Sequence, residues 1–473
     1  MNLSPRWSNK GLQLAALSLV ILCACKKDKS APLPFKSPEA YLAQNVMPTA
    51  FTADWEKVAA ISYLLYVATD SNFNHPLTGY NPLVVKTDSA RLTGLTSKTD
   101  YYYKVMAVGV QGDTTLPSNI IYSPTPDPND DRFVYIGSQD TYMYCFYAGT
   151  GARVWRYKTT DVTGDIESSA TISSDGILYF GGTNQRLYAL DPISGNKRWE
   201  FRTGGPIIAS PTVGPNAIYI STWSTGTLYG VNKNGSQKWS VVPSPNKYLY
   251  SSPTYSNGVV YIGSQDGNIY AYNSETGAKV WSASAGDTII SSPAVSNGIV
   301  YVGSFDRYLY AFDAATGGLK WRSATSDSIG SSPTISNGVV YVGSYDGYLY
   351  AFDAVTGARK WKSPTTGRIG SSPTVGNGTV YVGSFDKKLY AFDAATGASI
   401  WSTATGGRVY SSPSVSNGTV YVGSYDKNLY AMNAATGAIK WTAATGDSIR
   451  MSSPTVLTFP GKVVLPSISG DAQ

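Results

Sequence analysis

Tryptophan recurs at a nearly constant interval through the last two-thirds of the chain. Eight tryptophans form the series, and the last four intervals are each forty residues. They are Trp155, Trp199, Trp239, Trp281, Trp321, Trp361, Trp401 and Trp441. A period of forty with four short β-patterned runs is typical of a propeller blade, because one small sheet cannot bury both faces without stacking on neighbours. The repeat therefore predicts an all-β fold with an eight-bladed β-propeller.

The unit around Trp361 shows the pattern. Its β-rich runs are residues 340–344, 349–353, 360–363 and 372–375. Short turn clusters separate these runs and require antiparallel pairing, as in a four-stranded blade. A similar run at 452–456 follows Trp441, and we expect it to complete the first blade and remove its open edge. Whether residues 122–125 also supply an inner strand stays open.

A turn of the form Asp-x-x-Thr-Gly-x-x-x-Trp leads into several of these tryptophans, as at residues 313–321, 353–361 and 393–401. We expect the aspartate side chain to cap the turn and the glycine to supply a positive φ. An indole placed there should wedge between adjacent blades. Burying about 200 Å² of ring at about 25 cal/mol/Å² contributes roughly 5 kcal/mol before entropy. We therefore predict that the eight tryptophans are structural docking residues.

The repeat Leu-Tyr-Ala-Phe-Asp-Ala-x-Thr-Gly-x-x-x-Trp resembles the tryptophan-docking repeat of β-propellers of the pyrroloquinoline-quinone (PQQ) type. The resemblance covers roughly residues 130–473 and implies one of two classes. One class is the quinoprotein dehydrogenases, which hold PQQ and calcium. The other is cofactor-free scaffolds, such as the propeller lipoprotein of the outer-membrane β-barrel assembly machinery. The dehydrogenases carry adjacent cysteines over the quinone, and no two of Cys23, Cys25 and Cys145 are adjacent.

The chain offers few groups for catalysis. His75 is its sole histidine and precedes the repeats, so no histidine base or histidine metal cluster can form among them. Four aspartates recur at the same place in successive units, at Asp306, Asp346, Asp386 and Asp426. Single carboxylates forty residues apart lack the dense oxygen spacing of a calcium loop, which favours a role in turns. We predict no enzymatic activity, no cofactor and no metal.

The N-terminus indicates a lipoprotein. Arg6 and Lys10 precede an apolar stretch at 12–22 that is too short to span a bilayer. Residues 22–25 (Leu-Cys-Ala-Cys) resemble a bacterial lipoprotein processing box, with Cys25 as the lipidated residue. We predict a signal peptide at 1–24, a tether at 25–37 and a lipid-anchored protein of the bacterial cell envelope. No aspartate follows Cys25, which favours the outer membrane; the leaflet stays open.

Residues 38–125 resemble a fibronectin type III β-sandwich, with the propeller following at 126–473. Trp55 is the expected core residue between the sheets. Tyr101 is the expected corner tyrosine, whose hydroxyl ties back to the chain. After removal of residues 1–24 the chain has 35 basic and 31 acidic residues. This small and dispersed positive charge does not favour a nucleic-acid partner.

Specificity is expected at positions that vary between units, since units five to eight are nearly copies of one another. One variable strip precedes the Ser-Ser-Pro inner strand and should ring one mouth of the central channel. Its members are Tyr248, Tyr250, Ile289, Ile290, Arg368, Arg408, Tyr410, Arg450 and Met451. Trp223 adds a further aromatic ring in the irregular third unit. Arginine and aromatic residues are common contact residues at protein interfaces.

These observations predict a non-catalytic, lipid-anchored interaction protein that uses the propeller as a binding scaffold for a protein or glycan partner. The alternative is a saccharide-binding surface lipoprotein that uses tyrosine and tryptophan platforms. A PQQ-dependent dehydrogenase is the third hypothesis.

Overall fold

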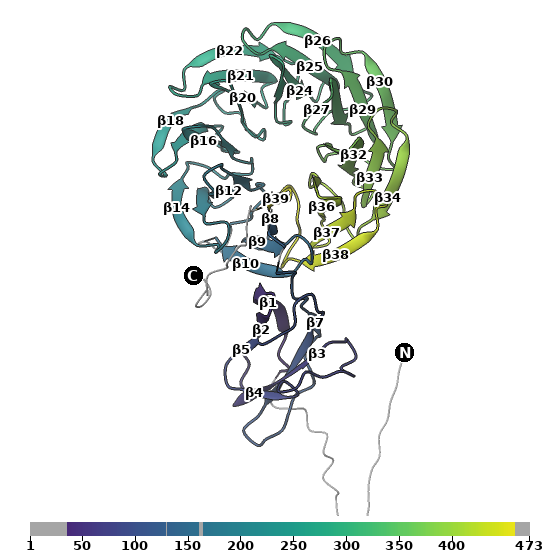
Figure 1. Ribbon diagram of the computed structural model, residues 1–473. Coiled ribbons are helices and arrows are strands. Elements are labelled where there is room, and N and C mark those ends of the chain that lie inside the picture. The colour runs from purple at the N-terminus through teal and green to yellow at the C-terminus, as the bar shows by residue number, and fades with distance from the viewer. Residues whose placement is uncertain (1–35, 129, 160–163, 459–473) are drawn as a thin grey trace, which may run out of the picture.

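The computed structural model describes residues 36–128, 130–159 and 164–458. The regular secondary structure of these residues is β-strand without helix, so the all-β prediction is confirmed. Figure 1 shows a large ring of sheets with a small body attached to it. No helix of the described ranges is long and apolar enough to cross a bilayer. The predicted signal peptide and Cys25 lie outside the described residues.

The small body consists of two antiparallel sheets. One contains β1 (Ala40–Met47), β2 (Ala50–Trp55) and β5 (Ser89–Thr93), in that order. The other contains β4 (Leu83–Val85), β3 (Ser62–Ala68), β6 (Tyr102–Val108) and β7 (Ile121–Tyr122). Because β7 pairs with β6, Tyr122 belongs to the small body and supplies no inner strand to the ring.

Two aromatic residues fix the core of the small body. Trp55 is 2% exposed, and its ring centroid lies 5.6 Å from that of Tyr63. The Tyr101 hydroxyl accepts a 2.9 Å hydrogen bond from the Thr96 N–H group. This core continues into the first sheet of the ring, where Phe133 belongs to the same buried cluster.

Within the described ranges, the ring contains eight four-stranded antiparallel sheets, whose strands follow one another from the channel outward. The first contains β39 (Thr455–Thr458), β8 (Arg132–Gly137), β9 (Tyr142–Tyr147) and β10 (Arg153–Lys158). The second contains β11 (Thr171–Ile172), β12 (Leu178–Gly182), β13 (Arg186–Leu190) and β14 (Lys197–Arg202). The third contains β15 (Thr212–Val213), β16 (Ala217–Ser221), β17 (Leu228–Asn232) and β18 (Gln237–Val241). The fourth contains β19 (Thr254–Ser256), β20 (Val259–Gly263), β21 (Asn268–Asn273) and β22 (Lys279–Ser284).

The other four sheets follow the same order. The fifth contains β23 (Ala294–Ser296), β24 (Ile299–Gly303), β25 (Tyr308–Asp313) and β26 (Leu319–Ala324). The sixth contains β27 (Thr334–Ser336), β28 (Val339–Gly343), β29 (Tyr348–Asp353) and β30 (Arg359–Pro364). The seventh contains β31 (Thr374–Gly376), β32 (Thr379–Gly383), β33 (Lys388–Asp393) and β34 (Ser399–Ala404). The eighth contains β35 (Ser414–Ser416), β36 (Thr419–Gly423), β37 (Asn428–Asn433) and β38 (Ile439–Ala444).

The four β-rich runs that the sequence groups around Trp361 belong to two sheets. The first three match β28, β29 and β30 to within about a residue at each end. The fourth, at 372–375, overlaps β31, which pairs with β32 of the next sheet. Grouping it with the preceding strands was wrong, because periodicity fixes the spacing of strands but not the point at which one sheet ends.

The ring closes through a strand taken from late in the chain. β39 pairs antiparallel with β8, with Thr455 opposite Tyr135 and Thr458 opposite Arg132. It becomes the inner strand of the first sheet, which otherwise contains β8 to β10. Figure 1 shows this pairing as β39 beside β8 at the channel. The edge of β8 is thereby covered, as expected for a closed ring.

Each indole of the series reaches the turn of an adjacent sheet. The Nε1 groups donate hydrogen bonds of 2.9–3.2 Å to carbonyl oxygens. The acceptors, in chain order of the tryptophans, are Pro192, Lys233, Ser274, Ala314, Ala354, Ala394, Ala434 and Ala148. The last bond joins Trp441 to the first sheet, so the contact runs around the whole ring.

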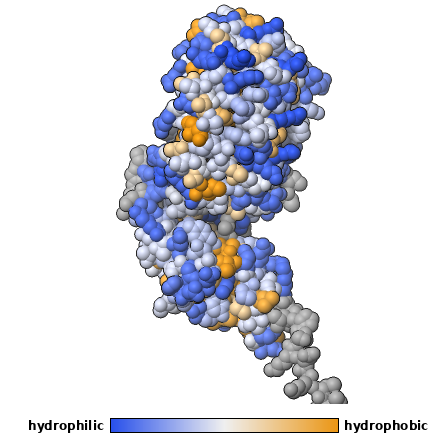
Figure 2. All heavy atoms as spheres, turned by 90° about the vertical axis from the view of Figure 1, so that its right-hand side faces the viewer, coloured by the Kyte–Doolittle hydropathy of each residue, from blue (hydrophilic) through white to orange (hydrophobic). Residues whose placement is uncertain are grey.

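A turn glycine makes this docking possible. Gly357 has φ +73°, and a Cβ atom built there would lie 2.7 Å from ring atoms of Trp321. A larger residue would push the indole away. Seen from the side, the outer surface of the ring is mainly hydrophilic with separate hydrophobic patches (Figure 2).

Candidate functional site at the channel mouth

A closed circle of hydrogen-bonded serines surrounds the channel. In each pair the backbone N–H group of one serine donates to the Oγ atom of the next, at 2.8–3.0 Å. The serine circle consists of Ser169, Ser210, Ser252, Ser292, Ser332, Ser372, Ser412 and Ser453. One serine comes from the segment before each inner strand, so the circle links all eight sheets.

A second circle runs two residues further along the inner strands. In each case a side-chain hydroxyl donates to a backbone carbonyl of the next sheet. Thr334, for example, donates to the carbonyl of Pro373 at 2.6 Å, and Pro373 directly precedes Thr374, the equivalent threonine of that sheet. The donors are Thr171, Thr212, Thr254, Thr334, Thr374, Ser414 and Thr455. Ala294 occupies this position in the fifth sheet and has no hydroxyl. The second circle is therefore interrupted at one sheet.

A cavity of about 580 Å³ opens over the serine circle. Each sheet contributes one further residue to its wall, two positions before the serine: Glu167, Ile208, Tyr250, Ile290, Gly330, Gly370, Tyr410 and Met451. Phe305, Thr288 and Gln265 complete the wall. Unlike the serines, these wall residues are not the same in every sheet, so the cavity has sides of different chemistry.

Glu167 is the acidic residue of the cavity wall. Its side chain is 13% exposed, and Oε1 lies 3.3 Å from both Arg450 Nη1 and Gln139 Nε2. Burial raises the pKa of Glu167, because it removes water from the charged form. Sequence reasoning missed this residue. Its segment reads Glu-Ser-Ser-Ala, without the proline that marks the corresponding segment in the other units.

Three arginines of the predicted strip lie over aromatic rings at the rim of the mouth. The guanidinium carbon of Arg368 lies 5.7 Å from the ring centroid of Tyr345, and that of Arg408 lies 5.6 Å from that of Phe385. Arg450 lies 5.7 Å from the Tyr425 ring. Cation–π attraction at such distances holds a guanidinium group in place while its edge stays exposed.

Tyr410 packs into the mouth more closely than the sequence predicts. Its ring centroid lies 5.4 Å from that of Phe385, and burial raises its pKa strongly. Gly370 leaves room for it, since a Cβ atom there would lie 2.8 Å from Cε2 of Tyr410. Tyr410 is therefore part of the packed wall as well as of the cavity surface.

The structure separates some residues of the predicted strip from the cavity. Ile289 is fully buried, and a Cβ atom on Gly263 would clash with it, so Ile289 is a core residue and its placement at the mouth was wrong. Trp223 packs on Tyr248 and Tyr250, with ring centroids 5.6 and 6.0 Å away. Of these three aromatic residues, Tyr250 lines the cavity.

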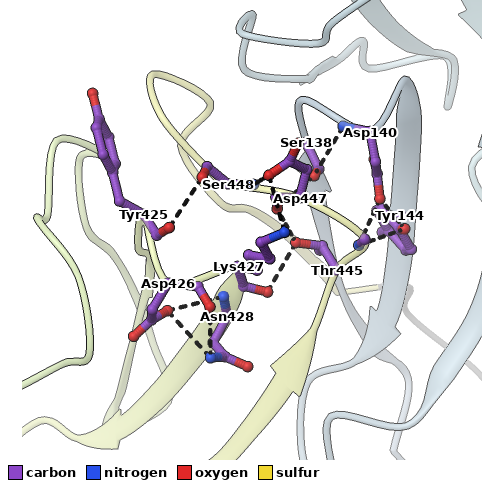
Figure 3. A network of polar contacts seen from close by, with 11 residues as sticks. Ser138, Asp140, Tyr144, Tyr425, Asp426, Lys427, Asn428, Thr445, Asp447 and Ser448 are labelled. Atoms are coloured by element: carbon purple, nitrogen blue, oxygen red, sulfur yellow. Dashed lines mark hydrogen bonds and ion pairs between the residues drawn. The ribbon is translucent and has the colours of Figure 1, made fainter. Parts of the chain in front are cut away.

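Hydrogen bonds fix the loops that carry the rim residues, as Figure 3 shows where the eighth sheet meets the first. Ser138 Oγ donates to the carbonyl of Asp447 at 2.9 Å, and Ser448 Oγ donates to that of Tyr425 at 3.0 Å. Asp447 also forms an ion pair with Lys427 at 3.4 Å. The loop before Arg450 is thus held by both sheets.

The repeated aspartates of the turns serve the same framework. Asp346 accepts hydrogen bonds from the Tyr348 N–H group, the Tyr350 hydroxyl and the Ser326 N–H group of the loop after β26. Among the residues that the structure describes, no group of three or more His, Cys, Asp or Glu side chains is placed to hold a metal. His75 lies in the small body, with Nδ1 3.1 Å from Asp70.

The closed ring of four-stranded sheets with docked tryptophans defines a β-propeller of the tryptophan-docking type. The family profile described as outer membrane protein assembly factor BamB matches residues 146–288, 265–372 and 346–472. The chain belongs to this family, which confirms the resemblance drawn from its repeats.

Individual relatives match over shorter stretches. BamB of Yersinia pestis is 27% identical over 145 residues, which is 28% of this chain and 37% of that protein. The tetrathionate hydrolase of Acidithiobacillus ferrooxidans is 25% identical over 178 residues, covering 33% of this chain and 36% of the hydrolase. The chain thus aligns with less than two-fifths of the length of either relative.

Solved structures support the fold. BamB of Moraxella catarrhalis superposes with a TM-score of 0.53 at 24% identity and covers 61% of this chain and 90% of its own. The computationally designed Ika8 protein superposes with a TM-score of 0.55 at 16% identity and covers 66% of this chain and 93% of its own.

Proposed function

We propose that this protein is a non-catalytic scaffold of the bacterial cell envelope that binds a protein partner at the channel mouth. In this proposal Cys25 carries the lipid anchor in the outer membrane. A fibronectin type III-like domain at 38–125 supports an eight-bladed propeller at 126–473. The matching family profile and most of the similar curated proteins are outer membrane assembly factors, which supports a scaffold.

The observation that carries the proposal is the contrast between the serine circle and the residues above it. The circle repeats in every sheet, whereas the wall and rim combine aliphatic, aromatic and charged side chains. Repetition is sufficient to stabilise a ring, since each sheet needs the same contacts. Side chains that vary around the mouth above a repeated floor support recognition of an asymmetric partner there.

Site-specific photocrosslinking in cells tests the proposal. A photoreactive phenylalanine replaces Tyr248, which is 40% exposed beside the mouth, or Val355, which is 73% exposed in an outer turn. We expect a discrete crosslinked protein from position 248 that disappears when Arg368 and Arg408 are both changed to Gln. Equal crosslinking from both positions would contradict recognition at the mouth.

The anchor has a separate test. Changing Cys25 to Ala should release the protein from the membrane fraction, because hydrophobic anchoring would then be lost. Membrane association that persists after this change, and after a high-salt wash, would contradict the proposed anchor.

Two alternatives receive less support. A saccharide platform requires an exposed flat aromatic face, but the rings of Trp223, Tyr248 and Tyr250 pack against one another at interplanar angles of 52–75°. A PQQ-dependent dehydrogenase would bind its quinone, which calorimetric titration of the soluble protein with PQQ and calcium would detect. We expect no heat of binding.

A further inference from the structure

The serine circle has unused hydrogen-bonding capacity. Each Oγ atom accepts an N–H group from its neighbour, which leaves the hydroxyl hydrogen free to donate. Within the ranges that the structure describes, none of the eight hydroxyls donates to a protein acceptor. All eight serines line the cavity. The floor of the mouth therefore presents a circle of donors.

The rim adds two cations beside this floor. Arg368 and Arg408 are exposed, come from consecutive sheets and flank Phe385, whose N–H group donates to the Arg368 carbonyl at 2.9 Å. Neither guanidinium has an acidic partner within 4.0 Å among the described residues. Stacking on aromatic rings restricts the motion of both side chains, which lowers the entropy lost when they bind an anion.

The other charges of the mouth leave this pair available. Arg450, which leads into the next sheet along the ring, is engaged with Glu167, and Lys427 is paired with Asp447. Asp327, in the loop that leads into the sixth sheet, has no ion pair among the described residues, and the corresponding positions before Arg368 and Arg408 are glycines. The carboxylates of Asp386 and Asp426 also lie beside the loops that carry the two arginines, but they accept hydrogen bonds from backbone N–H groups of those loops and from tyrosine hydroxyls. The seventh and eighth sheets thus form a local cationic arc at the rim.

From this donor circle and this cationic arc we propose that the mouth is a receptor for an acidic polypeptide segment. Carboxylates of aspartate or glutamate side chains bind the guanidinium groups of Arg368 and Arg408. Oxygen atoms at the tip of the segment accept hydrogen bonds from the serine hydroxyls. A cavity of about 580 Å³ is large enough for several side chains. The proposal rests on the proposed function, because it assigns the chemistry of the partner at that same mouth.

Fluorescence anisotropy with defined peptides tests the proposal on the full chain with Cys25 changed to Ser. The probe is a labelled decapeptide of alternating Glu and Gly with capped ends, and the control peptide has Gln in place of Glu. We expect the Glu peptide to bind on the order of tenfold more tightly or better, since charge-assisted hydrogen bonds to arginine are lost with Gln. Its binding should weaken as KCl is raised.

Matched variants locate the site. Arg368→Gln with Arg408→Gln should weaken the Glu peptide on the order of tenfold. The control, Lys233→Gln with Lys238→Gln, removes the same charge away from the mouth and should leave binding unchanged. Ser332→Ala with Ser372→Ala should weaken binding several-fold. Because these serines also join sheets, thermal melting of this variant must show that the ring is intact at the assay temperature.

Three results would overturn the inference: equal binding of the Glu and Gln peptides, equal loss in the arginine and lysine variants, or tighter binding of an oligogalacturonate than of the Glu peptide. The last would indicate an acidic glycan. If the peptides fail while position 248 still crosslinks a protein through Arg368 and Arg408, the partner is a protein of other chemistry and the proposed function stands.

Discussion

The contacts between sheets at the outside of the ring are the same in every sheet, whereas the residues of the channel mouth vary. At the wall, every sheet places a tryptophan against the turn of an adjacent sheet, with nearly the same hydrogen bond eight times. At the mouth, the serine circle is equally regular, but the residues above it change from glutamate to isoleucine, tyrosine, glycine and methionine. Repeated contacts stabilise the fold, and variable ones are free to serve recognition.

The largest expected effect tests the wall at its closing seam. Trp441 is 8% exposed and donates its indole hydrogen to the first sheet. Trp441→Ala should lower the free energy of unfolding by about 3–5 kcal/mol, measured by urea denaturation. As a control, exposed Val355→Ser should stay within about 0.5 kcal/mol of the unchanged protein. A loss below about 1 kcal/mol at Trp441 would mean that docking does not hold the ring.

Two glycines separate backbone strain from docking. Gly357 and Gly338 both have φ +73°, but a Cβ atom meets Trp321 at Gly357 and nothing within 4 Å at Gly338. Gly338→Ala should cost about 1–2 kcal/mol through backbone conformation alone. Gly357→Ala should cost about 1–3 kcal/mol more, because the indole must move. Urea denaturation measures both changes in the free energy of unfolding. Equal losses in the two variants would show that the Trp321 indole can move aside without cost.

Two substitutions in the interrupted second circle should change stability by smaller amounts, one lowering it and the other raising it. Thr334→Ala removes a hydroxyl bonded to Pro373 and should cost about 1 kcal/mol. Ala294→Thr adds the missing hydroxyl opposite Pro333 and should stabilise the protein by about 0.5–1 kcal/mol. Thermal denaturation of both variants measures the change. Destabilisation by Ala294→Thr would indicate that the fifth sheet does not follow the geometry of its neighbours.

The smallest effect concerns pH at the mouth. Because the folded pKa of Glu167 is raised above its usual 4.5, the folded state holds this proton more tightly than the unfolded state. Its contribution to stability therefore falls as pH rises from 4.5 through the raised pKa. Glu167→Gln should remove this dependence. The pKa of Asp313 is lowered to about 2, chiefly by a hydrogen bond from Lys320, so its contribution to stability falls as pH is lowered. Asp313→Asn should therefore change the pH dependence of stability in the opposite direction. Urea denaturation at a series of pH values measures the free energy of unfolding of each variant. If Glu167→Gln and Asp313→Asn changed its slope against pH in the same direction, burial of Glu167 would be contradicted.

The sequence predicts the tryptophan contacts between sheets better than the channel mouth, for a physical reason. Tryptophans, turn glycines and capping aspartates recur at fixed spacing, so their roles can be inferred from a single unit. Glu167 stands in a segment that departs from the template. Ile289 and Ile290 are neighbours in the segment before β23, and the repeat does not show which of the two side chains faces the core. Likewise, the serines are visible in every unit, but their circle exists only after the ring has closed.

That β39 completes the sheet begun by β8 has a consequence for the time course of folding. β8 is made early and its partner more than three hundred residues later, so its free edge remains open while seven other sheets form. Contacts this distant in sequence form slowly, and unpaired edges are the usual starting points of aggregation. The newly made chain therefore has a vulnerable interval that ends only when residues 455–458 arrive.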